Sequence, residues 1–257
     1  MRILHSLIQG DGPDLLILHG FLGMGDNWKS HGKKLVEAGY RVHLVDQRNH
    51  GRSFWDDEFT YELLTKDLIN YMDHHGIEDA IFLGHSMGGK TVMHFACAYP
   101  ERCNKLIVAD IAPRYYPPHH QHIIDGLQAL SPENLKSRTE ADRALSTHFD
   151  EVGLRSFLLK NLYRKSPEEL AFRFNLEALS MSLDMIGEPL SGTEQYTGPT
   201  LFLRGEYSEY VTETDHAGIH AHFPLAQIRT VSASGHWLHV ENPEGFQNEL
   251  LAFLKQG

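Results

Sequence analysis

A serine between two glycines gives this chain its strongest pattern for covalent chemistry. Residues 84–88 read Gly-His-Ser-Met-Gly, after the apolar run 80–83 and before a helix-period segment at 88–98. A serine at such a strand–turn–helix junction lies on a strained turn that exposes its hydroxyl, and the flanking glycines avoid collisions with neighbouring backbone. Ser86 is therefore the predicted nucleophile.

A serine hydroxyl is a weak nucleophile at neutral pH, so it needs a histidine base that is itself oriented by an acid. His236 lies in the loop between a late strand-like run and the segment 243–254, which is where such a base is expected. His239, three residues further on, is the alternative base. His85, which is adjacent to the serine, is expected to pack rather than to accept the proton.

Attack on a carbonyl creates an oxyanion, which two backbone N–H groups must face. The residue after the nucleophile, Met87, supplies one of them in this kind of turn. The second is expected from the loop 19–23, which reads His-Gly-Phe-Leu-Gly after the apolar run 15–18. The two glycines let this backbone approach the serine, and the N–H of Phe21 is the candidate donor.

These loops need a sheet to position them. Short apolar runs without alternation are typical of strands buried on both faces, as in a parallel sheet. Helix-period segments at 60–75, 88–98 and 243–254 alternate with the runs, and Asn242 followed by Pro243 is a start signal for the last helix. We expect an α/β protein with a mostly parallel sheet flanked by helices. The runs lie at 2–9, 15–18, 40–45, 80–83, 105–109, 199–203 and 226–231.

One long interval interrupts the alternation of strands and helices. It shows no convincing strand pattern, so we expect an inserted helical cap over the sheet edge. The division predicted from this is an α/β core at 1–112 and 198–257 with a cap at 113–197. The helix-like pieces of the cap lie at 120–130, 140–149, 152–163 and 168–185.

The charge balance limits the classes of partner. The 257 residues carry a net charge of −11, with a pI of about 5.9. Such a chain repels phosphate backbones and anionic lipid, so no nucleic-acid partner is expected. No stretch approaches the ~20 apolar residues of a membrane span, and residues 1–10 reach Asp11 before a secretion signal forms. We expect a cytoplasmic monomer or homodimer.

The motifs, taken together, resemble the α/β-hydrolase superfamily over essentially the whole chain and in the right order. The motifs are His19-Gly20-x-x-Gly23, Asp46-x-Arg48-x-His50-Gly51-x-Ser53, the segment 84–89 and Gly235-His236. Three details are similar to the YbfF-type bacterial esterases, namely Asn49 before His50, the run Asp110-Ile111-Ala112-Pro113, and the residues 235–239 around the base. This resemblance implies an α/β-hydrolase fold with a helical cap and hydrolysis of short- to medium-chain acyl esters or thioesters.

The acid departs from the superfamily's commoner pattern. That pattern places an aspartate in a G-x-x-D-x-x-V turn after the cap, and this chain has Ser208 at the corresponding position. A hydroxyl cannot stabilise an imidazolium as a carboxylate does. The resemblance places the acid at Asp110, which keeps the chain order serine, acid, histidine. Glu206 and Glu209 are the alternative acids, and a serine–histidine dyad supported by water is the alternative to any acid. Ser208 is expected to have no role.

Two further groups of polar residues have plainer interpretations. The three histidines within 119–122 lack a carboxylate or thiol at a regular spacing, which favours a solvated loop over a metal site. Asp46, Arg48 and His50 follow a strand and are expected to brace the oxyanion loop rather than to line the pocket. The chemistry expected of the serine needs no metal ion and no organic cofactor.

The sequence thus predicts a serine hydrolase that acts on a small-molecule acyl ester. Tyr207, Tyr210 and Trp237 are expected to contact the substrate because they flank the acid turn and the base. The alternatives are a serine-based C–C bond hydrolase or a cofactor-free perhydrolase of the same fold. A ligand receptor without catalysis is a further alternative from another functional class.

Overall fold

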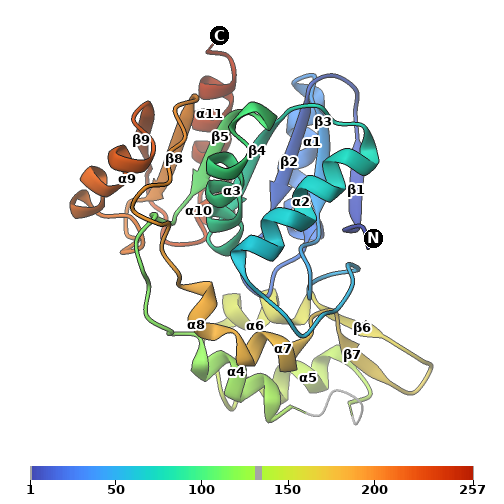
Figure 1. Ribbon diagram of the computed structural model, residues 1–257. Helices are drawn as coiled ribbons and strands as arrows, with labels where there is room; N and C mark the ends of the chain where they lie inside the picture. The colour runs from blue at the N-terminus through green and yellow to red at the C-terminus, as the bar shows by residue number, and fades with distance from the viewer. Residues whose placement is uncertain (1, 131–134, 257) are drawn as a thin grey trace.

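A central sheet carries the loops singled out in the sequence. The computed structural model describes residues 2–130 and 135–256, and within them a seven-stranded sheet has the order β1-β3-β2-β4-β5-β8-β9 (Figure 1). β1 runs antiparallel to β3, and the other neighbours are parallel. The strands are β1 (Ser6–Gln9), β2 (Asp14–Leu18), β3 (Arg41–Val45), β4 (Ala80–His85), β5 (Cys103–Ala109), β8 (Thr200–Gly205) and β9 (Ala226–Val231). The predicted α/β class with a mostly parallel sheet is confirmed.

Helices cover both faces of this sheet (Figure 1). One face packs against α2 (Tyr61–His75), α3 (Met87–Ala98) and α9 (His216–His222), and the other packs against α1 (Lys29–Glu37) and α11 (Pro243–Leu254). β2 shows why both faces are apolar, because successive residues of a strand point to opposite sides. Leu16 and Leu18 join the first cluster, and Leu15 and Ile17 join the second.

The last helix begins where the sequence predicted. Pro243 is its first residue, and the side chain of Asn242 accepts a hydrogen bond from the Gly245 N–H at 2.9 Å. This bond satisfies one of the N–H groups that have no partner inside a helix. Within the described residues, no helix is long and apolar enough to cross a membrane.

Between β5 and β8 the chain leaves the sheet and forms a separate layer of short elements (Figure 1). Their apolar side chains share one buried cluster with Phe21, Met87 and other residues of the core, so this layer packs on the loops around Ser86. The elements are α4 (Gln121–Gln128), α5 (Arg138–Leu145), α6 (Val152–Leu159), β6 (Leu162–Arg164), β7 (Leu170–Phe172), α7 (Leu176–Met181) and α8 (Leu183–Ile186).

The expectation of helices only in this layer is wrong at one place. β6 and β7 form an antiparallel hairpin, with Leu162 opposite Phe172, where helices had been predicted. The run around Ser166-Pro167 makes the turn, because proline cannot continue a helix. Leu170 and Phe172 are buried on either side of a half-buried Ala171, which is the alternation of a strand. Three residues are too few for this period to be recognised in the sequence.

Candidate active site

Ser86 lies on the sharp turn between β4 and α3. Its φ of 53° and ψ of −119° place it in a backbone region that non-glycine residues rarely adopt. The neighbouring glycines have no room for a side chain. A Cβ on Gly84 would lie 2.2 Å from the Gly88 carbonyl oxygen, and a Cβ on Gly88 would lie 2.4 Å from that of Leu18. The strand–turn–helix context that the sequence predicted for Ser86 is therefore present.

The loop after β2 lies directly against this turn. A Cβ on Gly20 would lie 3.3 Å from the Cβ of Ser86, so the two backbones are close here. Phe21 follows Gly20 and lines the same cavity as Ser86. Met87 is the first residue of α3, where an N–H has no partner within the helix. The structure thus brings both residues predicted to supply the oxyanion donors next to Ser86.

Buried side chains that follow β3 hold this loop in place. Asp46 accepts a hydrogen bond from the Gly25 N–H at 2.7 Å, and His50 Nε2 accepts one from the Leu22 N–H at 3.2 Å. Burial lowers the pKa of His50 to about 3, so its Nε2 remains an unprotonated acceptor at neutral pH. Neither Asp46 nor His50 lines the cavity. The segment braces the loop that contains Phe21, as the sequence indicated.

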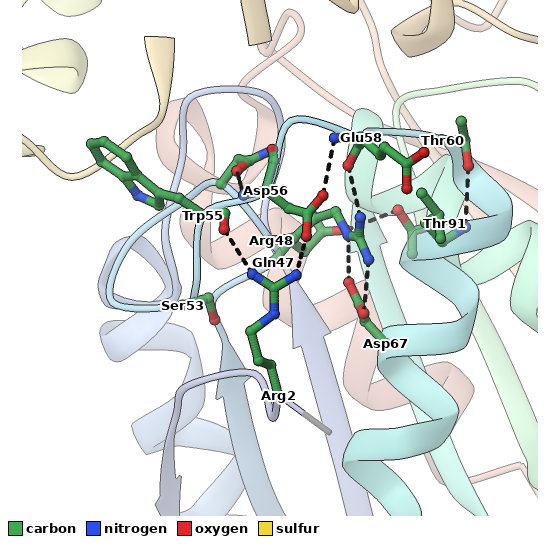
Figure 2. Close-up of polar contacts among 12 residues, drawn as sticks. Arg2, Gln47, Arg48, Ser53, Trp55, Asp56, Glu58, Thr60, Asp67 and Thr91 are labelled. Atoms are coloured by element: carbon green, nitrogen blue, oxygen red, sulfur yellow. Dashed lines mark hydrogen bonds and ion pairs between the residues drawn. The ribbon is translucent and has the colours of Figure 1, made fainter. Parts of the chain in front are cut away.

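Arg48 anchors the same segment to α2 (Figure 2). Its Nε and Nη2 atoms donate to the two carboxylate oxygens of Asp67 at 2.6 and 3.0 Å, in a buried bidentate pair. The adjacent Gln47 donates to the carbonyl oxygen of His19 and accepts from the hydroxyl of Thr91 on α3, both at 2.8 Å. The loop 19–23 is therefore tied to two helices of the core.

His236 and Asp110 form a hydrogen-bonded pair although they are far apart in the sequence. His236 Nδ1 lies 2.8 Å from Asp110 Oδ2. The carboxylate is fully buried, whereas the imidazole is 25% exposed. Because Nδ1 is engaged by the carboxylate, Nε2 is the ring nitrogen left for proton transfer. Ser86 and His236 line the same cavity, so the structure brings the three predicted residues together.

The surroundings of Asp110 correct one expectation. Its carboxylate also accepts hydrogen bonds from the Gly205 N–H, at 3.0 Å, and from the hydroxyl of Ser208. Ser208 was given no role in the sequence analysis, yet its hydroxyl contacts the same oxygen that His236 contacts. Ser208, at the position where relatives commonly have the aspartate, therefore donates a hydrogen bond to Asp110, which follows a different strand.

The alternative acids and the alternative base are engaged elsewhere. The carboxylate of Glu206 accepts from the Ala233 N–H at 2.7 Å, and Glu209 is exposed. The ring of His239 stacks on Trp28, with centroids 4.2 Å apart and planes 11° apart. Burial also lowers the pKa of His239 well below its ordinary value. The geometry thus favours Asp110 and His236 over these residues.

His85 packs beneath the base loop, as expected. Its Nε2–H donates to the carbonyl oxygen of His236 at 2.8 Å. Burial, followed by the proximity of the His236 ring, lowers the pKa of His85 to about 3. The neutral ring therefore supports the backbone of the base without adding a charge.

The three aromatic residues expected to contact substrate separate into two groups. Tyr210 and Trp237 line the cavity. The Tyr210 ring lies over the imidazole of His236, with centroids 3.8 Å apart and planes 17° apart. Tyr207 is 71% exposed and is not part of the cavity wall. It lies on the outer side of a turn whose inner side holds Ser208 against Asp110.

A cavity of about 550 Å³ opens above Ser86. The core contributes the loop 19–23 and the loop around His236 to its wall, and α6 contributes Leu154, Phe157 and Leu158. The Phe157 ring contacts that of Trp237, with centroids 5.5 Å apart, so the two sides of the cavity meet there. The reactive groups therefore face a largely apolar space that two separate layers enclose.

The expectation of a solvated loop at residues 119–122 fits His119 and His122, which are exposed, but is wrong for His120. His119 and His120 line the cavity, and the His120 ring packs against that of Phe21 with centroids 5.0 Å apart. Burial lowers the pKa of His120 to about 3, which a solvated loop would not do. The sequence held one signal for this burial, which is the position of His120 shortly after β5. Pro117 and Pro118 direct the chain across the edge of the sheet at this point.

The comparisons with known proteins agree with this fold. The family described as alpha/beta hydrolase fold matches residues 13–243. The mouse sn-1-specific diacylglycerol lipase ABHD11 is 38% identical over 97% of this chain and 84% of its own length. Esterase YbfF of Escherichia coli strain K12 is 32% identical over 96% of this chain and 94% of its own length.

A solved structure is also closely similar. The structure titled "Marine microorganism esterase" superposes with a TM-score of 0.95, at 38% sequence identity, over 98% of this chain and 100% of that one. The resemblance inferred from the motifs is thus confirmed. The chain belongs to the alpha/beta hydrolase fold family, and it is a hydrolase of the YbfF type.

Proposed function

We propose that this enzyme is a serine esterase that hydrolyses short- to medium-chain carboxylic esters through an acyl-enzyme. The observation that carries the proposal is the 2.8 Å hydrogen bond between His236 and the buried Asp110, at the edge of the cavity that Ser86 shares. A hydroxyl and an imidazole at one cavity, with a buried carboxylate hydrogen-bonded to the imidazole, form the set of groups that acyl transfer requires.

In the first step, Ser86 Oγ attacks the ester carbonyl while His236 Nε2 accepts its proton. Asp110 fixes the tautomer of the imidazole and stabilises the imidazolium that forms. The N–H groups of Phe21 and Met87 bind the oxyanion. Removal of one such donor typically lowers the rate by ~10²–10³-fold. The imidazolium then returns the proton to the departing alcohol.

In the second step, water replaces the alcohol. His236 accepts a proton from the water as its oxygen attacks the acyl-enzyme. The tetrahedral intermediate then collapses, the bond between Ser86 Oγ and the acyl carbon breaks, and the imidazolium returns the proton to Ser86 Oγ as the acid leaves. The same groups act in both steps, so the residues described here suffice for the cycle. Tyr210 and Trp237 are the proposed substrate contacts in the core wall, because both line the cavity.

The cavity supports an acyl ester as substrate. Apolar side chains of α6 face the reactive groups across about 550 Å³, a volume in the range of small-molecule sites. Two relatives of this chain carry names that refer to ester substrates, Esterase YbfF and the sn-1-specific diacylglycerol lipase ABHD11. Thioesters, which form the same tetrahedral intermediate, are a second substrate class. We propose that residues 113–197 form a cap that sets the size of the acyl group. All the proposed catalytic groups come from one chain, so the mechanism is the same for a monomer and for a homodimer.

The test uses purified enzyme with p-nitrophenyl acetate, butyrate, octanoate and palmitate. We expect turnover of the shorter members, covalent labelling of Ser86 by a fluorophosphonate, and loss of both in Ser86→Ala. Turnover of a ring-cleavage diketone without turnover of any ester would replace esterase activity by C–C bond hydrolysis. A folded wild type that neither labels nor turns over any ester would refute the proposal.

A further inference from the structure

A buried lysine that the proposed chemistry does not use lies one turn beyond the nucleophile. Lys90 is on α3 and its side chain is fully buried. Its Nζ donates to the carbonyl oxygens of Arg114 and Glu188, at 2.5 and 2.7 Å. Arg114 is on the segment through which the chain leaves β5 for the cap, and Glu188 is on the segment that returns from α8.

These two segments also bond to each other. The Tyr116 N–H donates to the Gly187 carbonyl oxygen, and the Leu190 N–H donates to that of Pro113, both at 2.9 Å. A Cβ on Gly187 would lie 1.8 Å from the carbonyl oxygen of Tyr116, so the segments approach as closely as backbones can. We call residues 113–116 and 187–190 the cap hinge.

The side chain of Lys90 is well suited to hold this hinge. A buried ammonium is costly unless its N–H groups are satisfied, and two carbonyl oxygens and the ring of Tyr116, 5.2 Å away, do so here. Burial, followed by repulsion from Arg114, lowers the pKa of Lys90 to about 7. Both protonation states keep at least two N–H donors, so both carbonyls can be bonded in either state.

The cap hinge lies next to Ser86, so its position affects the shape of the space around that residue. A small recess beside Ser86 and Met87 is walled by Tyr116 and Gly187, which are hinge residues. The chain continues from Tyr116 to His119 and His120, which line the main cavity. A shift of the hinge therefore moves the cap side of the cavity relative to Ser86.

We propose that Lys90 is a positioning residue that fixes the cap hinge to the nucleophile helix and so sets the place of the cap over the acyl-binding cavity. This inference rests on the proposed esterase function. The Lys90 side chain bonds to the hinge and not to the reacting groups, and the Lys90 backbone N–H donates to the Ser86 carbonyl oxygen at 3.0 Å. Esters whose acyl chains reach the cap depend on it, and acetyl esters, which end near Ser86, do not.

The experiment compares p-nitrophenyl octanoate with p-nitrophenyl acetate in the wild type, Lys90→Met and Lys90→Gln. The Met variant keeps the volume but removes the donors, so the octanoate-to-acetate ratio of kcat/KM is expected to fall by about tenfold, the scale of one lost hydrogen bond to a charged group. The fall should appear mainly in KM for octanoate, and the Gln variant, which retains an N–H₂ group, should be intermediate. The amides of Tyr116 and Leu190 should exchange hydrogen faster in the Met variant.

Tyr71→Phe on α2 is the matched control, because it removes hydrogen bonds to Ser6 on β1 and His43 on β3, away from the cap. It should lower the melting temperature and leave the ratio unchanged. Gly187→Ala, which forces the hinge apart while Lys90 stays intact, should lower the ratio as Lys90→Met does. If the lysine variants do not fold, an unchanged ratio in folded Gly187→Ala would overturn the inference, because the position of the hinge would then not affect which ester is preferred. An unchanged ratio in folded Lys90→Met would overturn this inference alone, whereas a wild type inactive on both esters would overturn the esterase proposal.

Discussion

The two walls of the cavity are built in different ways. In the core wall, backbone packs on backbone, as where Gly88 meets Leu18, and buried side chains hold each loop. The cap wall comes from α4, α6 and the segment before α4, within a layer of short helices and one hairpin. It is attached through a shared apolar cluster and a few polar contacts, such as Asn161 Nδ2 to the Leu22 carbonyl oxygen at 2.8 Å and the Asn175 N–H to that of Asn49 at 2.9 Å.

This difference suggests a division of labour. Positioning errors of about 1 Å can cost ~10²-fold in rate, so the groups that react need a rigid setting. An acyl chain needs only a space of suitable size, which side chains on short helices can adjust. Changes in the core wall should therefore lower kcat for every ester, whereas changes in the cap wall should alter which ester is preferred.

The largest effect is expected at Asp110. Asp110→Asn keeps the shape but loses the charge that stabilises the imidazolium and fixes its tautomer, so kcat should fall by ~10⁴-fold on acetate and octanoate alike. Steady-state kinetics with both esters measures this, and circular dichroism checks the fold.

Glu206→Gln and Glu209→Gln are the controls for Asp110→Asn. Each should stay within about threefold of the wild type, because neither carboxylate contacts His236. An active Asp110→Asn together with an inactive Glu206→Gln would show that Glu206, not Asp110, orients His236. The contrast drawn between the core wall and the cap wall would then lose its support.

The buried histidines of the core wall predict a stability that declines in acid. The folded-state pKa of His50 is lowered to about 3 by burial, below the unfolded value of ~6.5. Between these values the unfolded chain binds the extra proton, so the free energy of unfolding falls as pH falls from about 6.5, by at most ~1.4 kcal/mol per pH unit for this residue. Urea unfolding from pH 7.5 to 4.5 should give a shallower dependence for His50→Gln than for the wild type. Equal slopes would mean that His50 is not held neutral.

Ser208→Ala should have a smaller effect than Asp110→Asn. It removes one hydroxyl donor from a carboxylate that keeps its bonds to the Gly205 N–H and to His236. The loss of one hydrogen bond to a charged group predicts a fall of about tenfold in kcat, equal for short and long esters. Kinetics with acetate and octanoate test both statements, and a change confined to octanoate would place Ser208 among the groups that select the substrate.

The sequence was informative for the core wall and much less so for the cap wall, for a physical reason. Glycine spacing, apolar runs and the Asn242-Pro243 signal are local, so Ser86, His236 and the sheet could be predicted. The contact of Ser208 with Asp110 depends on two distant strands becoming neighbours, β5 beside β8, which no local pattern records. The hairpin and the burial of His120 likewise depend on the packing of short elements against the core.

The smallest expected effect, and the sharpest test of the cap wall, is at Phe157. This ring lines the cavity and contacts Trp237, so Phe157→Ala enlarges the space without touching Ser86, His236 or Asp110. We expect kcat/KM for p-nitrophenyl acetate to change by no more than about threefold, while the preferred acyl chain becomes longer. Val152→Ala on the same helix is the matched control, because Val152 is 65% exposed and does not line the cavity. If Phe157→Ala lowered kcat equally for all chain lengths, the cap would be holding the reactive groups as well, and the two walls would not differ in the way their construction indicates.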